Sequence, residues 1–432
     1  MTGARHRMSP AGVFPRAAKC SVARWIGLRG RALRIALVLS AVGLAACSGE
    51  SFGPPSPFSN CSLPLTSFTD AGAERSSIPA LTNPGVATRL IAPHVGYVNR
   101  RDMVIGLEFN GQPLAIPLKL LWYHEVLNLQ AESDPGDPSV AGERLTITYS
   151  PLTGSVSVFD PEPSGTPDFA VSKYVLDNNL VMDDGSGTLY PQLSRTATCG
   201  PRDGSSLTRV PYELMLYGAW LQIFLDTWIA TRATGHDFLY TLYPYGNYRD
   251  PDNASLFYPT SAPIDPRRRP KERVVGVPSG TGGIAFAISD LREMAARDQE
   301  GRNTSVWAAS AMARGEPIVA FWNSTAQSAR IYRARANGRP LTFEVVDGRR
   351  QDVETGSVWN FSGEAVDGPL EGEKLEAHPE AYHAFWFAWA AFQPDTEVWA
   401  APIPLTGSAD FVPADDAALP PPDPDLVRRY PR

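Results

Sequence analysis

An internal repeat limits what this chain can fold into more than any other feature of its sequence. Short runs rich in Gly and Pro recur in the same order, and the separation between copies drifts by only a few residues. The matched runs are Val104-Ile105-Gly106 with Val274-Val275-Gly276, Gly142-Glu143 with Gly315-Glu316, Gly165-Thr166-Pro167 with Gly338-Arg339-Pro340, Asp183 with Asp352, Gly187-Thr188-Leu189-Tyr190 with Gly356-Ser357-Val358-Trp359, and Gly200-Pro201 with Gly368-Pro369. We therefore predict two tandem homologous copies that pack with pseudo-twofold symmetry.

Each copy shows the same order of hydrophobic patterns. A strand comes first, then a short apolar helix, a hairpin and a closing helix. The expected strands are 103–109, 273–277 and 341–345, the expected hairpins 145–159 and 318–332, and the expected helices 118–129, 211–232, 288–296 and 381–392. The 40 prolines favour short strands and turns over long helices. The predicted fold class is strand-rich α+β.

The first 46 residues have the pattern of a bacterial secretion signal. Arginines precede an apolar run at 35–44, which is too short to span a bilayer. The run ends in Leu44-Ala45-Ala46-Cys47, which looks like a lipobox and predicts lipidation of Cys47. The alternative is an ordinary signal peptide with an incidental Cys. Because Ser48 follows the Cys, we expect a lipid anchor in the cell envelope, on the periplasmic face of the outer membrane.

The rest of the chain divides by composition. Residues 47–76 are rich in Ser, Pro and Gly and predict a tether. We expect the first repeat copy at 77–239, a Tyr-, Pro- and Arg-rich linker at 240–270, and the second copy at 271–402. The Pro- and Asp-rich tail, 403–432, is expected to be loose. A hydrophobic content of 43% suits a packed core, and the net charge of −7 argues against a nucleic-acid partner.

Two cysteines remain after the signal and the lipid anchor are set aside. Of the four in the chain, Cys20 leaves with the signal peptide and Cys47 takes the lipid. In an oxidising compartment, Cys61 and Cys199 are expected to form a disulfide. In the chain-entropy model so long a loop contributes roughly 4–5 kcal/mol. Two buried free thiols are the alternative.

The hairpin at 145–159 carries the main candidate site. Its Ser150-Pro151-Leu152-Thr153-Gly154 turn can hold two small side chains, Ser150 and Thr153, toward one site. His124 and Glu125 precede it on a short helix, where the His can bind a metal or shuttle a proton. The alternative is a half-buried His bound to a backbone carbonyl. The second copy has Asn323 and Ala326 at the matching turn positions.

Other candidate sites have plainer structural explanations. Asp183 and Asp184 can offer carboxylates to a cation, but an Asp-capped turn explains them as well. The pairs His378/His383 and His236/Asp237 lack the spacing or the nucleophile of a working site. The aromatic run 385–392 is typical of a core helix. The Gly-rich run 279–283 lacks the Lys of a nucleotide loop.

A family resemblance rests on several of these runs together. They are Thr148-Tyr149-Ser150-Pro151-Leu152-Thr153-Gly154, the earlier His124-Glu125, Glu354-Thr355-Gly356-Ser357-Val358-Trp359, Phe385-Trp386-Phe387-Ala388-Trp389 and Pro394-Asp395-Thr396. Over 77–402 the chain resembles the domain-of-unknown-function family 3179. That family usually carries Tyr-Cys-Pro-Leu-Cys-Gly, and some members are described as selenoproteins, which implies a thiol or metal redox site. Here Ser150 and Thr153 replace both cysteines, and hydroxyls do not form thiolates.

Three functions follow as hypotheses. The first is a binding or structural envelope lipoprotein, not an enzyme, that has lost the thiol or metal redox site and needs no cofactor. The second is a metal-binding or redox protein whose ligand site is formed by His124, Glu125, Tyr149, Ser150 and Thr153. The third is a hydrolase that uses Ser150 with His124. It ranks last because no oxyanion-hole motif accompanies the Ser.

Overall fold

The fold is described from a computed structural model. It describes residues 60–72, 77–88, 96–132, 142–165, 168–297, 305–402 and 423–426. The expected signal peptide and the lipobox Cys47 lie outside this part of the chain. Within it, no helix has the length and hydropathy needed to cross a membrane.

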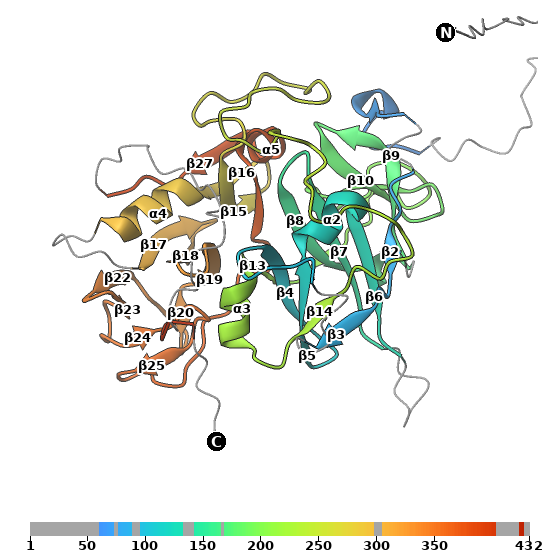
Figure 1. Ribbon diagram of the computed structural model, residues 1–432. Helices are drawn as coiled ribbons and strands as arrows, with labels where there is room; N and C mark the ends of the chain where they lie inside the picture. Colours follow the sequence, from blue (N-terminus) through green and yellow to red (C-terminus); the bar gives the residue numbers. More distant parts are fainter. Residues whose placement is uncertain are drawn as a thin grey trace, which may run out of the picture. The chain divides into compact units, whose positions relative to one another are not determined.

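The described residues form a strand-rich α+β fold, as predicted, with four α-helices (Figure 1). Before residue 240 the elements are η1 Leu65–Ser67, β1 Thr69–Asp70, β2 Leu81–Thr82, β3 Val86–Thr88, β4 Met103–Phe109, β5 Gln112–Pro117, α2 Leu118–His124, β6 Val126–Gln130, β7 Arg144–Ser150, β8 Ser155–Asp160, η2 Glu162–Ser164, β9 Ala170–Leu176, β10 Asn179–Asp183, β11 Leu189–Pro191, β12 Thr208–Arg209, β13 Glu213–Leu216, α3 Tyr217–Ile223 and β14 Trp228–Ala230. We call residues 77–239 the first half.

The second half, residues 271–402, begins with the next regular strand. Its elements are β15 Arg273–Ser279, β16 Gly282–Ala287, α4 Ile288–Ala296, β17 Val306–Ala313, β18 Glu316–Asn323, β19 Ser328–Arg333, β20 Arg335–Ala336, β21 Arg339–Pro340, β22 Phe343–Val346, β23 Arg349–Asp352, β24 Val358–Trp359, β25 Ala365–Asp367, β26 Tyr382–Phe385, α5 Trp386–Phe392 and β27 Asp395–Val398.

One strand arrangement occurs in both halves. In the first half the order is β13-β4-β5-β14, and in the second it is β26-β15-β16-β27. The first two neighbouring pairs are antiparallel and the third is parallel in each case. A nine-stranded sheet continues from the first half into the second where β8 pairs with β26. The two halves are therefore joined by backbone hydrogen bonding as well as by side chains.

In both halves a glycine on a strand faces the ring of a tryptophan on a helix. A Cβ atom on Gly106 would overlap the ring of Trp220, and one on Gly276 would overlap the ring of Trp389. Each indole N–H donates to the threonine seven residues later: Trp220 to Thr227 at 2.7 Å, and Trp389 to its own partner threonine at 2.9 Å. Gly106 on β4 thus lets α3 lie directly on the sheet, and Gly276 on β15 does the same for α5.

Three of the four expected helices are shorter than the sequence suggested. Helix α2 ends at His124 because Glu125 has a positive φ of 56°, after which the chain enters β6. Residues 211–232 form strand, helix and strand instead of one helix, because their ends pair with β4 and β5. Helix α5 likewise follows a short strand. Only α4 has the expected bounds, 288–296.

The folded chain starts earlier than the expected tether boundary at 76. Residues 60–72 pack on the first half, where β1 pairs with β9. A disulfide joins Cys61 to Cys199 across 138 residues, and Leu63 donates its backbone N–H to the Thr198 carbonyl. This arm therefore belongs to the globular part of the protein.

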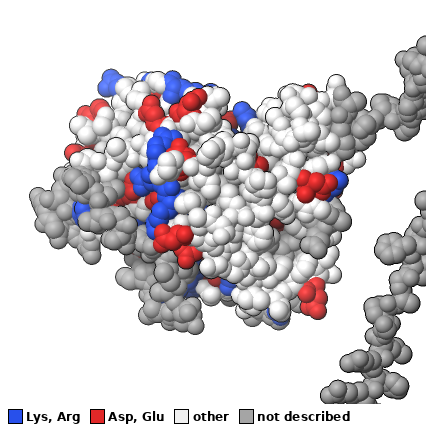
Figure 2. Space-filling view, turned by 90° about the horizontal axis from the view of Figure 1, so that it is seen from above, with Lys and Arg blue, Asp and Glu red and all other residues white. Residues whose placement is uncertain are grey.

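Within the tail, the described residues 423–426 differ from the expectation of a loose segment. Residues 423–426 fold onto the protein, and the side chain of Leu426 is fully buried. On the molecular face seen in Figure 2, basic and acidic side chains lie next to one another in the same areas. A contiguous column of basic side chains on this face has acidic side chains at its ends.

Candidate functional site

The hairpin that carries the main candidate residues has the predicted form. Strands β7 and β8 are antiparallel, and Ser150 lies opposite Ser155 at the last pair before the turn. The turn is buried, with exposed fractions of 0% for Ser150 and Thr153. Phe385 of β26 donates its N–H to the Thr153 carbonyl at 2.7 Å. The hairpin tip is therefore enclosed by the second half instead of opening to solvent.

The segment between the halves also covers the tip. Tyr248, in the linker, donates its hydroxyl to the Leu152 carbonyl at 3.0 Å. A side chain on Gly154, which has a φ of +58°, would overlap the ring of Phe385. A hairpin tip that is covered on both sides is better suited to an internal packing contact than to an active site, which must admit substrate and release product.

The two faces of the hairpin differ in chemistry. Leu145, Ile147, Tyr149, Val156 and Val158 lie in one hydrophobic cluster. Because side chains alternate along a strand, the opposite face carries a row of hydroxyls, all of them fully buried. Its members are Thr146, Thr148, Ser150, Ser155 and Ser157. A buried polar row of this kind needs internal hydrogen-bond partners.

Two amides from β10 and the turn after β11 supply these partners. Asn179 donates to Thr153 Oγ1 at 3.1 Å and to Gln192 Oε1 at 2.9 Å. Gln192 donates to Thr148 Oγ1 at 2.8 Å and accepts from Ser155 Oγ at 2.5 Å. Since Ser155 gives its proton to the amide, the 2.7 Å bond between Thr153 and Ser155 has Thr153 as donor. The Thr153 hydroxyl is thus used both as donor and as acceptor.

Ser150 differs from Thr153 in this respect. Its Oγ atom is buried, and among the described residues it has no hydrogen-bond partner. No base contacts this hydroxyl, so the described residues provide no means of activating it as a nucleophile. The geometry gives no support to the hydrolase hypothesis.

His124 lies at the end of α2 and is fully buried. Its Nδ1 is 2.7 Å from the Pro79 carbonyl and its Nε2 is 2.7 Å from the Tyr240 hydroxyl. A carbonyl only accepts, so Nδ1 carries the proton and Nε2 accepts from Tyr240. Burial lowers the pKa of His124 to about 4. The ring is therefore neutral, and it ties the segment at Pro79 and the linker residue Tyr240 to the end of α2.

Glu125 and Tyr149 connect the end of α2 to the hairpin. The Tyr149 N–H donates to the Glu125 carbonyl at 2.8 Å, and both side chains are buried. Burial raises the pKa of Tyr149 to about 12, against the lowering effect of Arg249 and Arg273. The two arginines and their proximity to this phenol were not expected from the sequence.

The structure thus brings Ser150 and Thr153 onto one hairpin, but not into one hydrogen-bonded site with His124. Among the described residues, no hydrogen bond joins the imidazole to either hydroxyl. The same residues contain no group of three His, Cys, Asp or Glu side chains placed to hold a metal ion.

The remaining candidates have structural roles. Asp183 and Asp184 accept backbone N–H bonds within their own turn, from Gly185 and Ser186. Asp352 likewise accepts a backbone N–H within its own turn, from Thr355.

The other histidines and the Gly-rich run also have ordinary surroundings. His378 accepts from the Glu380 N–H at 3.3 Å, and His383 is bonded to Tyr212 at 3.0 Å. His236 stacks on Phe238 near the surface. Residues 279–283 contain the tight turn between β15 and β16, and the aromatic run after 385 is a buried helix, as expected.

Sequence reasoning missed Asn179 and Gln192, which satisfy the buried hydroxyls. A usable signal was present: Thr146, Thr148, Ser150, Ser155 and Ser157 alternate with apolar residues, and all are small hydroxyl residues. Solvent-facing positions of a strand usually include long charged side chains. Their absence here indicated a second buried face.

The family described as "Protein of unknown function (DUF3179)" matches residues 75–396. The chain belongs to this family. The match covers both halves, including the hairpin and the two Gly–Trp contacts. Searches of curated proteins and of solved structures gave no significant match.

Proposed function

We propose that this DUF3179 protein is a lipid-anchored protein of the bacterial cell envelope with a binding or structural role, in which the family's thiol or metal redox site has been lost. The observation that carries the proposal is the state of the hairpin tip. Thr153 is used as donor and acceptor in a buried amide–hydroxyl network, and the buried Ser150 Oγ has no hydrogen-bond partner in the part of the chain that the structure describes. Neither side chain can supply a thiolate.

The surroundings of His124 support the same proposal. Both ring nitrogens are used by Pro79 and Tyr240, and burial favours the neutral ring. Metal binding through this His would require one of these bonds to break. The metal-binding alternative, with His124 and Glu125 as ligands, is therefore the less favoured of the two.

We further propose that the two halves are tandem copies related by a pseudo-twofold axis. Three observations support this. The strand orders match, the Gly–Trp–Thr contact occurs twice, and the backbone bonds between halves are reciprocal. Phe385 donates to Thr153, and Leu216 of the first half donates to Ala326 at 3.0 Å. On this proposal the hairpin tip of each copy contacts the end strand of the other.

Anchoring at Cys47 rests on the sequence and is tested by itself. The chain is expressed with its signal sequence, and incorporation of a labelled fatty acid is compared with that of a Cys47→Ser variant. We expect label and membrane association in the first and neither in the second. Labelling of the Cys47→Ser chain would remove the proposal of this anchor.

The loss of the redox site is tested on the purified mature chain. Metal content is measured by elemental analysis, and thiol turnover by a disulfide-reduction assay. A Ser150→Cys/Thr153→Cys variant serves as the matched control, because it restores the family's Cys-Pro-Leu-Cys turn. We expect no stoichiometric metal and no turnover in the natural chain, and metal uptake or turnover in the control. Stoichiometric metal in the natural chain that is lost in a folded His124→Ala variant would establish the alternative.

A further inference from the structure

The four C-terminal residues that the structure describes are held by a set of buried groups. Arg350 is fully buried, and its Nη1 donates to Asp425 Oδ1 at 2.5 Å. Its other nitrogens donate to the carbonyls of Trp307 and Trp322 at 3.2 and 2.6 Å. Asp425 is the only carboxylate that pairs with this guanidinium in the described part of the chain. Because an unpaired charge is costly in the protein interior, this buried guanidinium strongly favours a carboxylate bound beside it.

A second group recognises the same carboxylates. The Asn323 amide donates to Asp423 at 3.0 Å and to Asp425 at 2.7 Å, while its oxygen accepts from the turn at Ala326. Phe361 donates its backbone N–H to the Asp425 carbonyl at 3.1 Å. The carboxylates of Asp423 and Asp425 and the backbone of the segment therefore all make hydrogen bonds to the second half.

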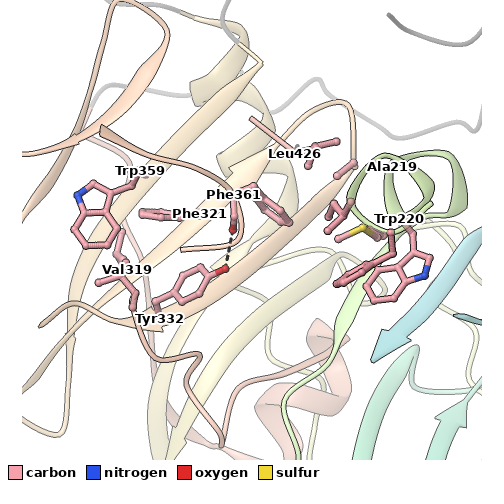
Figure 3. Close-up of a cluster of buried hydrophobic side chains, with 14 of the residues drawn as sticks. Ala219, Trp220, Val319, Phe321, Tyr332, Trp359, Phe361 and Leu426 are labelled. Atoms are coloured by element: carbon pink, nitrogen blue, oxygen red, sulfur yellow. Dashed lines mark hydrogen bonds between the residues drawn. The ribbon is translucent and has the colours of Figure 1, made fainter. Parts of the chain in front are cut away.

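The apolar end of the segment fills a position between the halves. Leu426 is fully buried in a cluster that includes Ala219 and Trp220 of the first half and Phe361 of the second (Figure 3). On the same side, Gln222 of α3 accepts the Asp423 N–H at 2.8 Å. The segment thus contacts both halves at once.

The segment also has a conformation that it stabilises by itself. The Asp425 N–H donates to the Asp423 side chain at 3.0 Å, and the Leu426 N–H donates to the Asp423 carbonyl at 3.0 Å. Pro424 fixes one backbone angle of this turn. A turn that is preorganised in this way loses little conformational entropy on docking, as is typical of short peptide ligands.

We propose that Arg350, Asn323, Phe361 and Gln222 form a binding site for an acidic peptide of the pattern Asp-Pro-Asp-Leu, and that the chain's own residues 423–426 are its resident ligand. The site selects two carboxylates two residues apart, followed by an aliphatic side chain. It joins the two halves when the segment is bound. This proposal does not depend on the proposed loss of the redox site.

The proposal is tested with a labelled peptide of residues 420–430 and a full-length chain that carries Asp425→Ala and Leu426→Ala. Fluorescence anisotropy measures binding. We expect saturable one-to-one binding to this variant, and binding that is weaker by roughly tenfold or more to the natural chain, whose own segment occupies the site. A peptide with Asp425→Asn should also bind roughly tenfold more weakly.

Three results would overturn the proposal: no saturable binding to the folded variant, equal binding to the natural chain, or equal binding of the Asn peptide. If circular dichroism shows that the variant is unfolded, the natural peptide is added during refolding. Recovery of the native spectrum then supports the site, and failure to recover it removes the proposal.

Discussion

The carbonyl oxygen of Thr153 accepts a 2.7 Å hydrogen bond from the backbone N–H of Phe385. This bond joins the hairpin tip of the first half to the end strand of the second. It occurs on a segment whose side chains are also engaged, since Thr153 Oγ1 lies in the network with Ser155 and Asn179. Thr153 is therefore part of the contact between the halves through its backbone, while its hydroxyl is held within the first half.

The two hydroxyls of the turn should differ in their effect on stability. A Thr153→Val change removes a hydroxyl that is both donor and acceptor, and it leaves buried partners unsatisfied. We expect a loss of about 1–3 kcal/mol in the free energy of unfolding. Ser150→Ala removes a hydroxyl with no partner among the described residues, so stability should be unchanged or higher by about 1 kcal/mol.

Urea unfolding of both variants beside the natural chain measures this difference. Equal losses in the two variants would mean that the Ser150 hydroxyl has a partner of similar strength. In that case the asymmetry between the two turn positions would not exist.

Replacing either glycine of the Gly–Trp contacts by alanine should destabilise the protein, and Gly276→Ala should cost more, because its Cβ would also overlap the Ile284 carbonyl oxygen. A methyl group at Gly106 or at Gly276 would overlap the facing indole, so each Gly→Ala change should cost about 1–3 kcal/mol or more. Combining Gly106→Ala with Trp220→Phe, which shortens the ring, should recover part of the loss. Thermal unfolding of the four chains in this cycle gives the coupling energy. An absence of coupling would show that the glycine is not required by the ring.

Local patterns in the sequence were sufficient for part of the fold. Alternating residues gave the hairpin at 145–159, and the bounds of α4 followed from its apolar spacing. The expectation of one long helix over 211–232 was wrong. Leu214, Tyr217 and Leu221 have helical spacing, but the start of this segment pairs with β4 and is therefore a strand. Pairing between distant segments overrides local propensity, and no window of sequence contains both partners.

The candidate site, like the fold, could be predicted from the sequence only in part. Placing Ser150 and Thr153 on one turn needed only local pattern, and the turn has that form. Their surroundings depend on Asn179, Gln192 and Phe385, which come from three other elements. The burial of the tip was therefore not readable from the hairpin itself.

Stability should depend on pH through His124. Its pKa in the folded chain is about 4, below the ordinary value of 6.5, because burial disfavours the charged ring. Between these two values the unfolded chain binds more protons, so the free energy of unfolding falls as the pH is lowered from 6.5 toward 4. One such His contributes at most about 1.4 kcal/mol per pH unit. His383, with a pKa lowered to about 3 by burial, adds to the same trend.

A His124→Gln variant should show a flatter profile over this range, because it removes one of the titrating groups. Tyr240→Phe is the matched control. It removes the hydroxyl bonded to Nε2 and should lower stability while keeping most of the pH dependence. An unchanged slope in the Gln variant would mean that His124 does not titrate in the way its burial requires.

The disulfide between Cys61 and Cys199 should stabilise the first half by tying the N-terminal arm to it. The bond closes a loop across 138 residues, for which the chain-entropy model gives roughly 5 kcal/mol. We expect a reducing agent to lower the unfolding midpoint of the natural chain. A Cys61→Ser/Cys199→Ser variant should have the lower midpoint even without reducing agent, and adding the agent should not lower it further. Because the disulfide is the covalent link between the 60–72 arm and the rest of the fold, limited proteolysis should cleave this arm first in the reduced chain. If reduction changes neither the unfolding midpoint nor the cleavage pattern of the natural chain, the strand pairing, the Asp70–Lys173 ion pair and the packing of Phe68 are enough to hold the arm.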